Sequence, residues 1–309
     1  MTEKKYRYSE LFGGHGYIDE HNNLIPGTVQ GEGEYTGVTS LWLRLHGCNL
    51  ECNGFGQLDP TDPSSYHLPC QNIDVSKYNS MEELPVFSKG CDSSYSWSKK
   101  FMHLAHQETA KEIVNNLRQR LYKNKFTHEV TNQPCHMVFT GGEPILNQNA
   151  LVDIFKEFVT QGEVPEYVTI ETNGTIQLRD EFIDIVTEIR KYQPFELFWS
   201  VSPKIYATSG ERPEKAIKPD VVGRYNALSN RGQLKFVCNG SKRSWDEIES
   251  AITQFRAAGV VFPVWIMPVG ATIEGQELVA ADIADQAIYR GYNVSVRAHV
   301  YLYGNALGR

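Results

Sequence analysis

Residues 135–142 read Cys-His-Met-Val-Phe-Thr-Gly-Gly, a short apolar run that stops at two glycines. The run has the length of one buried strand, and the glycines mark a turn after it. Apolar residues then recur every three or four positions, as they do on one face of a helix: Leu151, Ile154, Phe155, Phe158 and Val159. This part of the chain therefore predicts one strand–turn–helix unit.

The same unit recurs along the chain. Residues 41–45 read Leu-Trp-Leu-Arg-Leu and predict the first core strand. We expect further strands at 167–171, 196–201, 233–238, 261–267 and 293–299, and helices at 110–121, around 182–189, around 248–255 and near 277–290. Repeated strand–helix units give parallel strands with right-handed crossovers. The sequence thus predicts an α/β fold, either a full or partial β/α barrel or an open doubly wound sheet. In both, the chemistry belongs at the carboxyl ends of the strands.

Two stretches interrupt this rhythm. Residues 53–90 contain four prolines among many Ser, Asp and Asn residues and have no clear period. Residues 203–219 contain three more prolines. We expect a loop-rich insertion in the first stretch and a long loop in the second, because prolines and short polar residues favour turns over regular elements. The whole chain, residues 1–309, is expected to form one domain.

The composition excludes several classes of protein. The 309 residues carry 30 Lys and Arg against 37 Asp and Glu, a formal net charge of -7. This acidic balance argues against direct binding of nucleic acid, whose affinity depends on cations that meet phosphates. No stretch approaches the roughly 18–20 apolar residues of a membrane span. No apolar run follows the first lysines, so we expect a cytoplasmic protein without a secretion signal.

Two cysteines directly follow the first core strand. Cys48 and Cys52 lie four residues apart, at the carboxyl end where chemistry is expected. Such a pair suits one metal centre, either a closed zinc site with four ligands or a four-iron cluster. Three cysteines on a four-iron cluster would leave one iron open to a small molecule. Cys70 and Cys91 are the candidates for the third thiolate. The two other cysteines lie in predicted strands and are expected in the core: Cys135 and Cys238.

The cysteine loop belongs to a longer ordered pattern. Residues 47–52 read Gly-Cys-Asn-Leu-Glu-Cys, after Gln-Gly-Glu-Gly at 30–33 and Trp-Leu-Arg-Leu at 42–45. This order resembles the radical S-adenosylmethionine (SAM) enzymes, and within them the 7-carboxy-7-deazaguanine synthase (QueE) family. The resemblance continues to Arg-Ala-His-Val at 297–300, which is similar to the family's closing strand with its histidine. It implies a partial (β/α)6-type radical SAM barrel.

The superfamily's third cysteine is displaced in this chain. The usual motif is CxxxCxxC, but a phenylalanine stands three residues after the second cysteine. Cys-Asp-Ser-Ser-Tyr-Ser-Trp at 91–97 resembles the run that the family's third cysteine opens. The resemblance therefore implies that residues 53–90 are inserted between the second and third ligands. It implies a 4Fe–4S cluster held by Cys48, Cys52 and Cys91.

Motifs at strand ends resemble the family's SAM site. Thr-Gly-Gly-Glu-Pro at 140–144 is similar to the motif that binds the SAM amino group, and Glu-Thr-Asn-Gly-Thr at 171–175 is similar to one near its ribose. Ser-Pro-Lys at 202–204 would suit its carboxylate. The implied SAM contacts are Gly141, Gly142, Glu143, Glu171, Asn173, Ser202 and Lys204. Lys235, in a further family-like strand, fits an outward, solvated position equally well.

The resemblance also implies a reaction. Family members convert 6-carboxy-5,6,7,8-tetrahydropterin to 7-carboxy-7-deazaguanine through a 5′-deoxyadenosyl radical, with ring contraction and loss of ammonia. The implied substrate contacts are Gln30, Glu32, Arg44 and His299, with Arg44 facing the carboxylate and His299 at a strand end. Ser93 keeps the hydroxyl of a family threonine that sits at a Mg²⁺ site. The product serves transfer RNA (queuosine) or DNA modification, and no motif here separates the two.

Two other readings remain open on the sequence. Activating enzymes for glycyl-radical proteins share the cysteine loop and the glycine motif but act on a protein backbone. A non-catalytic zinc or iron–sulfur binding module is the second. The resemblance to the pterin enzymes further implies a small-molecule pterin substrate, an electron donor such as a flavodoxin or ferredoxin, and a homodimer.

Overall fold

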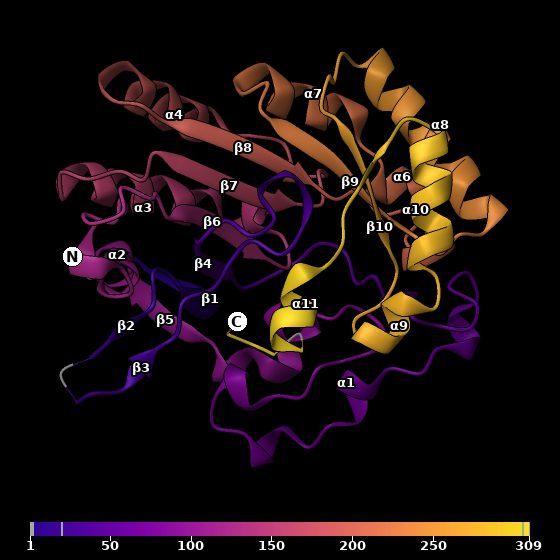
Figure 1. Cartoon of the computed structure of the whole chain (residues 1–309), viewed down its shortest axis with the longest axis horizontal. Coiled ribbons are helices and arrows are strands. Elements are labelled where there is room, and N and C mark those ends of the chain that lie inside the picture. Colours follow the sequence, from indigo (N-terminus) through magenta and orange to yellow (C-terminus); the bar gives the residue numbers. More distant parts are fainter. Residues whose placement is uncertain (1–2, 20, 305, 309) are drawn as a thin grey trace.

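The computed structural model describes residues 3–19, 21–304 and 306–308, and a large central sheet dominates it (Figure 1). Nine strands follow one another across this sheet in the order β11, β10, β9, β8, β7, β6, β4, β1 and β5. Their bounds are β1 (Lys5–Gly13), β4 (Ser40–Leu45), β5 (His106–Thr109), β6 (His136–Gly141), β7 (Tyr167–Thr172), β8 (Glu196–Val201), β9 (Gly232–Cys238), β10 (Val264–Pro268) and β11 (Asn293–Val294). A separate hairpin pairs β2 (Tyr17–Ile18) with β3 (Leu24–Ile25).

β4, β6, β7, β8, β9, β10 and β11 pair in parallel along the sheet. At the other end of this sheet, β1 runs antiparallel to both β4 and β5. Parallel strands that are consecutive in the chain are also neighbours in the sheet, without the reversal of order that marks a doubly wound sheet. The predicted α/β class with a large parallel sheet is therefore confirmed, and the doubly wound alternative does not describe these strands.

Helices connect the parallel strands and pack against one another in chain order, as the upper half of Figure 1 shows. The longer helices are α2 (Ala110–Gln119), α3 (Gln148–Thr160), α4 (Asp180–Tyr192), α7 (Pro219–Leu228), α8 (Lys242–Ala257) and α10 (Ala280–Tyr289). The short ones are α1 (Pro69–Asn72), α5 (Tyr206–Ser209), α6 (Pro213–Ala216), α9 (Ile273–Glu277) and α11 (Ala298–Tyr303). Among the described residues, no helix has the length and apolarity needed to cross a membrane.

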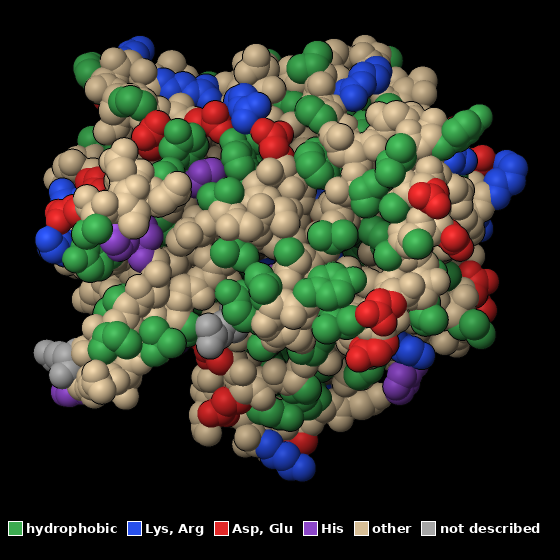
Figure 2. Space-filling model, viewed as in Figure 1, with side chains coloured by type: hydrophobic (Ala, Val, Ile, Leu, Met, Phe, Trp, Pro, Cys, Tyr) green, Lys and Arg blue, Asp and Glu red, His purple; other side chains and the backbone are tan. Residues whose placement is uncertain are grey.

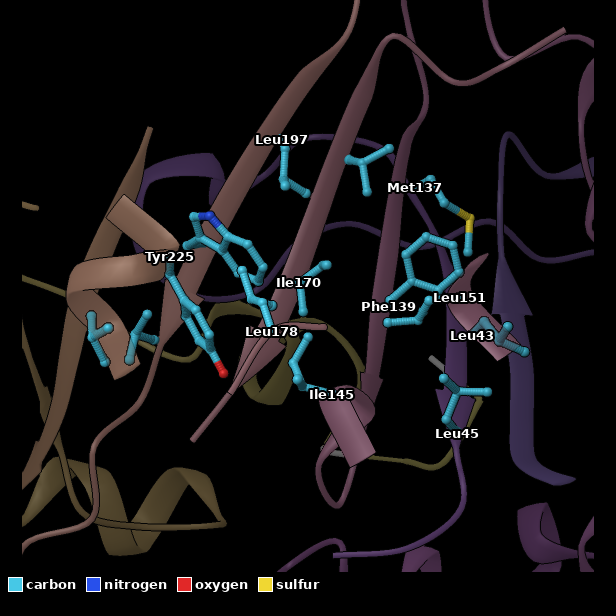
Figure 3. Close-up of a cluster of buried hydrophobic side chains, with 14 of the residues drawn as sticks. Leu43, Leu45, Met137, Phe139, Ile145, Leu151, Ile170, Leu178, Leu197 and Tyr225 are labelled. Carbon is cyan, nitrogen blue, oxygen red and sulfur yellow. The ribbon is translucent and has the colours of Figure 1, made fainter. Parts of the chain in front are cut away.

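The main core lies between the sheet and these helices (Figure 3). Phe139 and Ile170 project from β6 and β7, and Leu151 meets them from α3; all three are fully buried. Val159 was expected on the same helical face but is 50% exposed. It lies at the edge of the apolar stripe and in the last turn of α3, where the helix leaves the sheet.

The predicted closing strand at 293–299 is wrong over most of its length. β11 contains only two residues, and Ser295 still donates from its backbone N–H to the Ile266 carbonyl at 2.9 Å. The chain then leaves the sheet, because the Ala298 N–H donates to the Gly31 carbonyl at 2.8 Å. His299 therefore lies in α11 and not at a strand end.

Residues 53–90 fold into short turns around α1, below the sheet in Figure 1. They contribute most of a second apolar cluster, separate from the main core: Cys70, Met81, Leu84 and Phe87, with Tyr95, Phe101 and Leu104 from the following segment. Charged side chains of both signs are interspersed over the face in Figure 2. The segment is thus a small packed unit with its own apolar interior.

His136 in β6 makes the stability of the protein depend on pH. Burial lowers its pKa to about 4, although Glu196 opposes the shift, and its Nδ1 has no partner among the described residues. A depressed histidine pKa gives stability that is present above pH 6.5 and is lost as the pH falls through the folded value. Between pH 7.5 and 5.5, we expect this group to cost about 1.4 kcal/mol of unfolding free energy. Urea unfolding of the wild type and of His136→Phe at pH 7.5 and 5.5 measures this cost. The loss of unfolding free energy between the two pH values should be smaller in His136→Phe by this amount, and an equal loss in both proteins would contradict the prediction.

Candidate active site

A cavity of about 300 Å³ lies at the carboxyl ends of the parallel strands. This is the edge of the sheet where the sequence predicted chemistry. All but one of the predicted site residues line the cavity, although they come from segments far apart in the chain: Gln30, Glu32, Arg44, Cys48, Cys52, Cys91, Ser93, Gly141, Gly142, Glu171, Asn173, Ser202, Lys204 and His299. The exception is Glu143.

The loop that carries Cys48 rests on the two glycines after β6. A Cβ atom at Gly141 would lie 2.3 Å from the Leu45 carbonyl oxygen, and one at Gly142 would lie 2.5 Å from Cys48 Cβ. Contacts this short leave no room for a side chain. The glycine pair is therefore needed so that the β6 turn can pass directly beneath the cysteine loop.

The segment 53–90 is closed at its base, and this closure brings Cys91 to the cavity. The Gly90 N–H donates to the Phe55 carbonyl at 2.7 Å. Cys91 therefore follows a residue that is hydrogen-bonded three positions after Cys52, although the 38 residues 53–90 separate Cys52 from Cys91 in sequence. Cys70 instead packs in the apolar cluster of this segment and does not line the cavity.

The three cavity thiols fit a metal cluster in their chemistry. They are free of disulfides. Burial raises the pKa of Cys48 to about 12, and the nearby Cys91 adds to the rise, so these thiols stay protonated unless a cation sits among them. Among the described residues, no three His, Cys, Asp or Glu side chains stand close enough to hold a single ion. A four-iron cluster is larger than a single zinc ion. Thiolates that are too far apart for one ion therefore suit a cluster better than they suit zinc.

Glu143 is fully buried and does not line the cavity. Its carboxylate accepts from the Asn173 N–H at 2.7 Å, the Thr172 hydroxyl at 2.8 Å and the Ile145 N–H at 3.0 Å. Burial raises its pKa to about 7, although these donors lower it. In this structure the side chain joins the ends of β6 and β7, and the expected contact with SAM through its carboxylate stays a prediction.

The other predicted SAM residues present polar groups to the cavity. Asn173 donates from Nδ2 to Asn49 Oδ1 at 3.0 Å, which ties the β7 end to the cysteine loop. Lys204 donates from Nζ to Ser202 Oγ at 2.8 Å. Its cation also lies 5.8 Å from the centre of the Phe55 ring. A free ammonium beside a hydroxyl is suited to an anionic group such as a carboxylate.

A network of buried charges lines part of the cavity wall. Lys235 is 2% exposed and places Nζ 2.5 Å from Glu32 Oε2 and 3.2 Å from Glu171 Oε2. Arg297 binds Glu32 at 2.9 Å and Asp92 at 2.7 Å. Burial alone would raise the pKa of Glu32, but Lys235 and Arg297 outweigh it and hold the pKa well below its usual value. The solvated alternative for Lys235 is therefore wrong.

Arg44 reaches the cavity already paired with a carboxylate. Its Nε donates to Glu10 Oε2 at 2.6 Å, and the Tyr95 hydroxyl donates to the same oxygen at 2.7 Å. The Gly308 N–H donates to the other oxygen of Glu10 at 3.0 Å. Sequence reasoning missed Glu10, Tyr95, Asp92 and Arg297. The signal for Glu10 is its register opposite Arg44 in the antiparallel β1–β4 pair, which no single-chain period reveals.

His299 and Ser93 both line the cavity, but their surroundings differ. Burial lowers the pKa of His299 to about 4, although Glu32 opposes this, so the ring is neutral at pH 7. A neutral imidazole can both donate and accept a hydrogen bond. Ser93 Oγ lies 3.4 Å from Cys91 Sγ, and the Mg²⁺ site expected there stays a prediction.

Gly31→Ala is expected to impair substrate binding more than SAM binding. A Cβ at Gly31 would lie 1.9 Å from His299 Nδ1, so the histidine and α11 must shift. Overpacking of this kind costs about 1–3 kcal/mol. We expect a raised KM for the pterin with unchanged SAM cleavage in its absence. Gly275→Ala is the control, because its Cβ would lie at ordinary van der Waals distances from its neighbours, 3.4 Å from Thr272 Oγ1 and 3.6 Å from Gly270 Cα. Equal KM values in the two variants would contradict the prediction that Gly31 leaves room for His299 beside the substrate.

Comparison with known proteins gives one consistent result. The 7-carboxy-7-deazaguanine synthase of Rhodopirellula baltica is 24% identical over 282 residues, which cover 90% of this chain and 84% of that protein. The enzyme of the same name from Halobacterium salinarum is 27% identical over 296 residues, or 90% and 88%. QueE from Escherichia coli aligns over 96% of this chain and 95% of its own, with a TM-score of 0.49 and 17% identity. No family model matches.

Proposed function

The chain belongs to the 7-carboxy-7-deazaguanine synthase family of radical SAM enzymes, and we propose that it converts 6-carboxy-5,6,7,8-tetrahydropterin to 7-carboxy-7-deazaguanine. One observation carries the proposal. Three free thiols and the predicted polar and charged side chains line one cavity at the carboxyl ends of the strands. We also propose that the sheet and its helices form a partial (β/α)6 barrel of the radical SAM type, with 53–90 as an insertion.

When bound, the reduced 4Fe–4S cluster and SAM supply a 5′-deoxyadenosyl radical that abstracts hydrogen from the substrate. In this proposal Cys48, Cys52 and Cys91 hold three irons and leave the fourth for SAM. The Gly141–Gly142 backbone and Asn173 hold the amino and ribose groups. Lys204, positioned by Ser202, holds the SAM carboxylate. Within the described part of the chain its ammonium forms no ion pair with a carboxylate, which supports this role.

The remaining cavity groups orient the pterin. Gln30 and Glu32 provide an amide and a carboxylate for an amino-pyrimidine edge, since both groups match its pattern of donors and acceptors. Arg44 faces the substrate carboxylate, and Ser93 would hold a Mg²⁺ ion that would supply further positive charge beside it. The neutral ring of His299 donates or accepts at the same wall. Burial of these groups excludes water, so each polar contact fixes the substrate more strongly than in solvent.

The test is an anaerobic assay of the iron–sulfur-reconstituted protein with SAM, Mg²⁺, a reductant and 6-carboxytetrahydropterin, followed by mass spectrometry. Appearance of 7-carboxy-7-deazaguanine supports the proposal. Deoxyadenosine without that product would support radical chemistry but contradict the pterin substrate. An activating enzyme for a glycyl-radical protein would give this result. If protein with a full cluster yields neither product, a non-catalytic binding module is the remaining interpretation.

The cellular setting follows from the same proposal. The cluster needs a low-potential electron donor such as a flavodoxin or ferredoxin, and we expect a cytoplasmic homodimer. A sedimentation measurement of the purified protein checks the oligomeric state. Omission of Mg²⁺ with chelator present should slow product formation and leave SAM cleavage without substrate unchanged.

A further inference from the structure

Trp97 directs its indole N–H at one of the three cavity thiols. Its Nε1 lies 3.5 Å from Cys91 Sγ. An indole nitrogen can only donate, so sulfur is the acceptor in this contact. The Ser93 hydroxyl lies 3.4 Å from the same sulfur, but either atom could donate there. The Trp97 contact is therefore the one with a fixed polarity.

The other tryptophans behave differently. Their indole nitrogens are buried without a hydrogen-bond partner in the described part of the chain: Trp42, Trp199, Trp245 and Trp265. All four of these buried N–H groups lack an acceptor among the described residues. Burial of an indole in this protein therefore does not by itself place an acceptor beside its N–H. The contact at Trp97 results from where its turn places it.

A tight turn brings Trp97 back over Cys91. The Ser96 N–H donates to the Ser93 carbonyl at 2.9 Å, and the Trp97 N–H donates to the Ser94 carbonyl at 3.3 Å. The Ser96 carbonyl in turn accepts from the Gly47 N–H at 2.8 Å, directly before Cys48. The turn is thus anchored to the cysteine loop on the opposite side, which keeps the indole aligned with the sulfur.

We propose that Trp97 sets the reduction potential of the iron–sulfur cluster through its N–H···S hydrogen bond to Cys91. The proposal rests on the proposed function, since it assumes that Cys91 is a cluster ligand. Reduction adds one electron from the low-potential donor and increases negative charge on the thiolate sulfurs. A fixed N–H dipole stabilises that charge more in the reduced than in the oxidised cluster, so it raises the potential. Trp97 acts through Cys91 and is a positioning residue, not a catalytic one.

Trp97→Phe tests this with little change in shape. The ring stays and only the N–H donor is lost. A potentiometric titration followed by electron paramagnetic resonance, without pterin, should show a more negative midpoint. We expect about a tenfold lower ratio of reduced to oxidised cluster at a fixed potential, or 59 mV for one electron. Iron content should stay at the wild-type value.

Trp245→Phe is the matched control, because it removes an indole N–H that has no partner among the described residues and lies on α8. Its midpoint should equal that of the wild type. An unchanged midpoint in Trp97→Phe, or an equal shift in the control, overturns the proposal. Because the titration uses no pterin, it remains decisive even where the assay for 7-carboxy-7-deazaguanine fails.

A second measurement covers the case in which Trp97→Phe does not assemble a cluster. Wild-type protein is grown with tryptophan labelled with ¹⁵N at the indole nitrogen and reduced with dithionite. We expect a ¹⁵N hyperfine coupling to the reduced cluster, because Trp97 alone among the described tryptophans has its nitrogen bonded to a cavity thiol. Absence of the coupling overturns the proposal regardless of how the variant folds.

Discussion

Cys91→Ala is expected to leave a protein that binds no stable 4Fe–4S cluster and cleaves no SAM. Cys91 reaches the cavity beside Cys48 and Cys52 because the insertion is closed at its base by the Gly90–Phe55 hydrogen bond. Two remaining thiolates cannot hold three irons. Iron and sulfide analysis after reconstitution, together with the yield of deoxyadenosine, measures the loss. We expect both to fall to background.

Cys70→Ala is the matched control. Cys70 is 8% exposed and packs in the apolar cluster of the insertion, away from the cavity. Its loss should cost about 1 kcal/mol of stability, as for other small truncations of buried side chains, with full iron content and full SAM cleavage. Activity in Cys91→Ala combined with cluster loss in Cys70→Ala would reverse the assignment of the third ligand.

Much of the fold was predictable because its signals are local. The parallel strands β4, β6, β7, β8, β9 and β10 contain five to seven residues each and are rich in apolar side chains. Helices such as α3 repeat their apolar residues at helical spacing. Local periods cannot give the path of the chain after β11. There the Gly31 carbonyl competes with the sheet edge for the Ala298 N–H, and this competition depends on a segment 267 residues away.

The predicted site came from strand-end motifs, and the structure brings all of it except Glu143 to one cavity. The charges that surround it were missed for a physical reason. Lys235 lies in an alternating strand, where one sequence cannot say which face is solvated. Only the position of Glu32 and Glu171 across the cavity shows that its side chain points inward. Glu10 and Arg44 likewise meet through antiparallel register.

Lys235→Met is expected to destabilise the protein by about 3–5 kcal/mol, because loss of one partner leaves buried carboxylates uncompensated. Lys235 binds two of them, at Glu32 and Glu171. Glu32 keeps Arg297 as a partner, whereas Glu171 keeps, among the residues that the structure describes, the neutral donors Gln30 and Ser200. The main penalty should therefore arise at Glu171. Urea unfolding of the variant and the wild type measures it.

The stability of Lys235→Met should depend on pH differently from that of the wild type. In the wild type, Lys235 helps to hold the pKa of Glu32 below its usual value, which contributes stability above pH 4.5 that is lost only in acid. Without the lysine, the strongest of the charges that lower the pKa of Glu32 is gone, and burial opposes ionisation of this carboxylate more effectively. Glu32 then contributes less stability above pH 4.5, so less is lost in acid. Unfolding measured between pH 5 and 3 should show a smaller loss of stability in Lys235→Met than in the wild type, and an equal loss would contradict this role of the lysine.

A second change separates charge balance from lost packing. Adding Glu171→Gln to Lys235→Met removes the uncompensated charge and keeps an amide oxygen to accept from Gln30 Nε2, now 2.9 Å from Glu171 Oε1. We expect this double variant to recover most of the lost stability. Lys242→Met, at an ion pair in which the lysine is 87% exposed, should change stability by no more than about 0.5 kcal/mol. If the double variant is no more stable than Lys235→Met, then lost packing and not unpaired charge accounts for the role of the lysine. Its two short ion pairs with Glu32 and Glu171 would then add no net stability at the cavity wall.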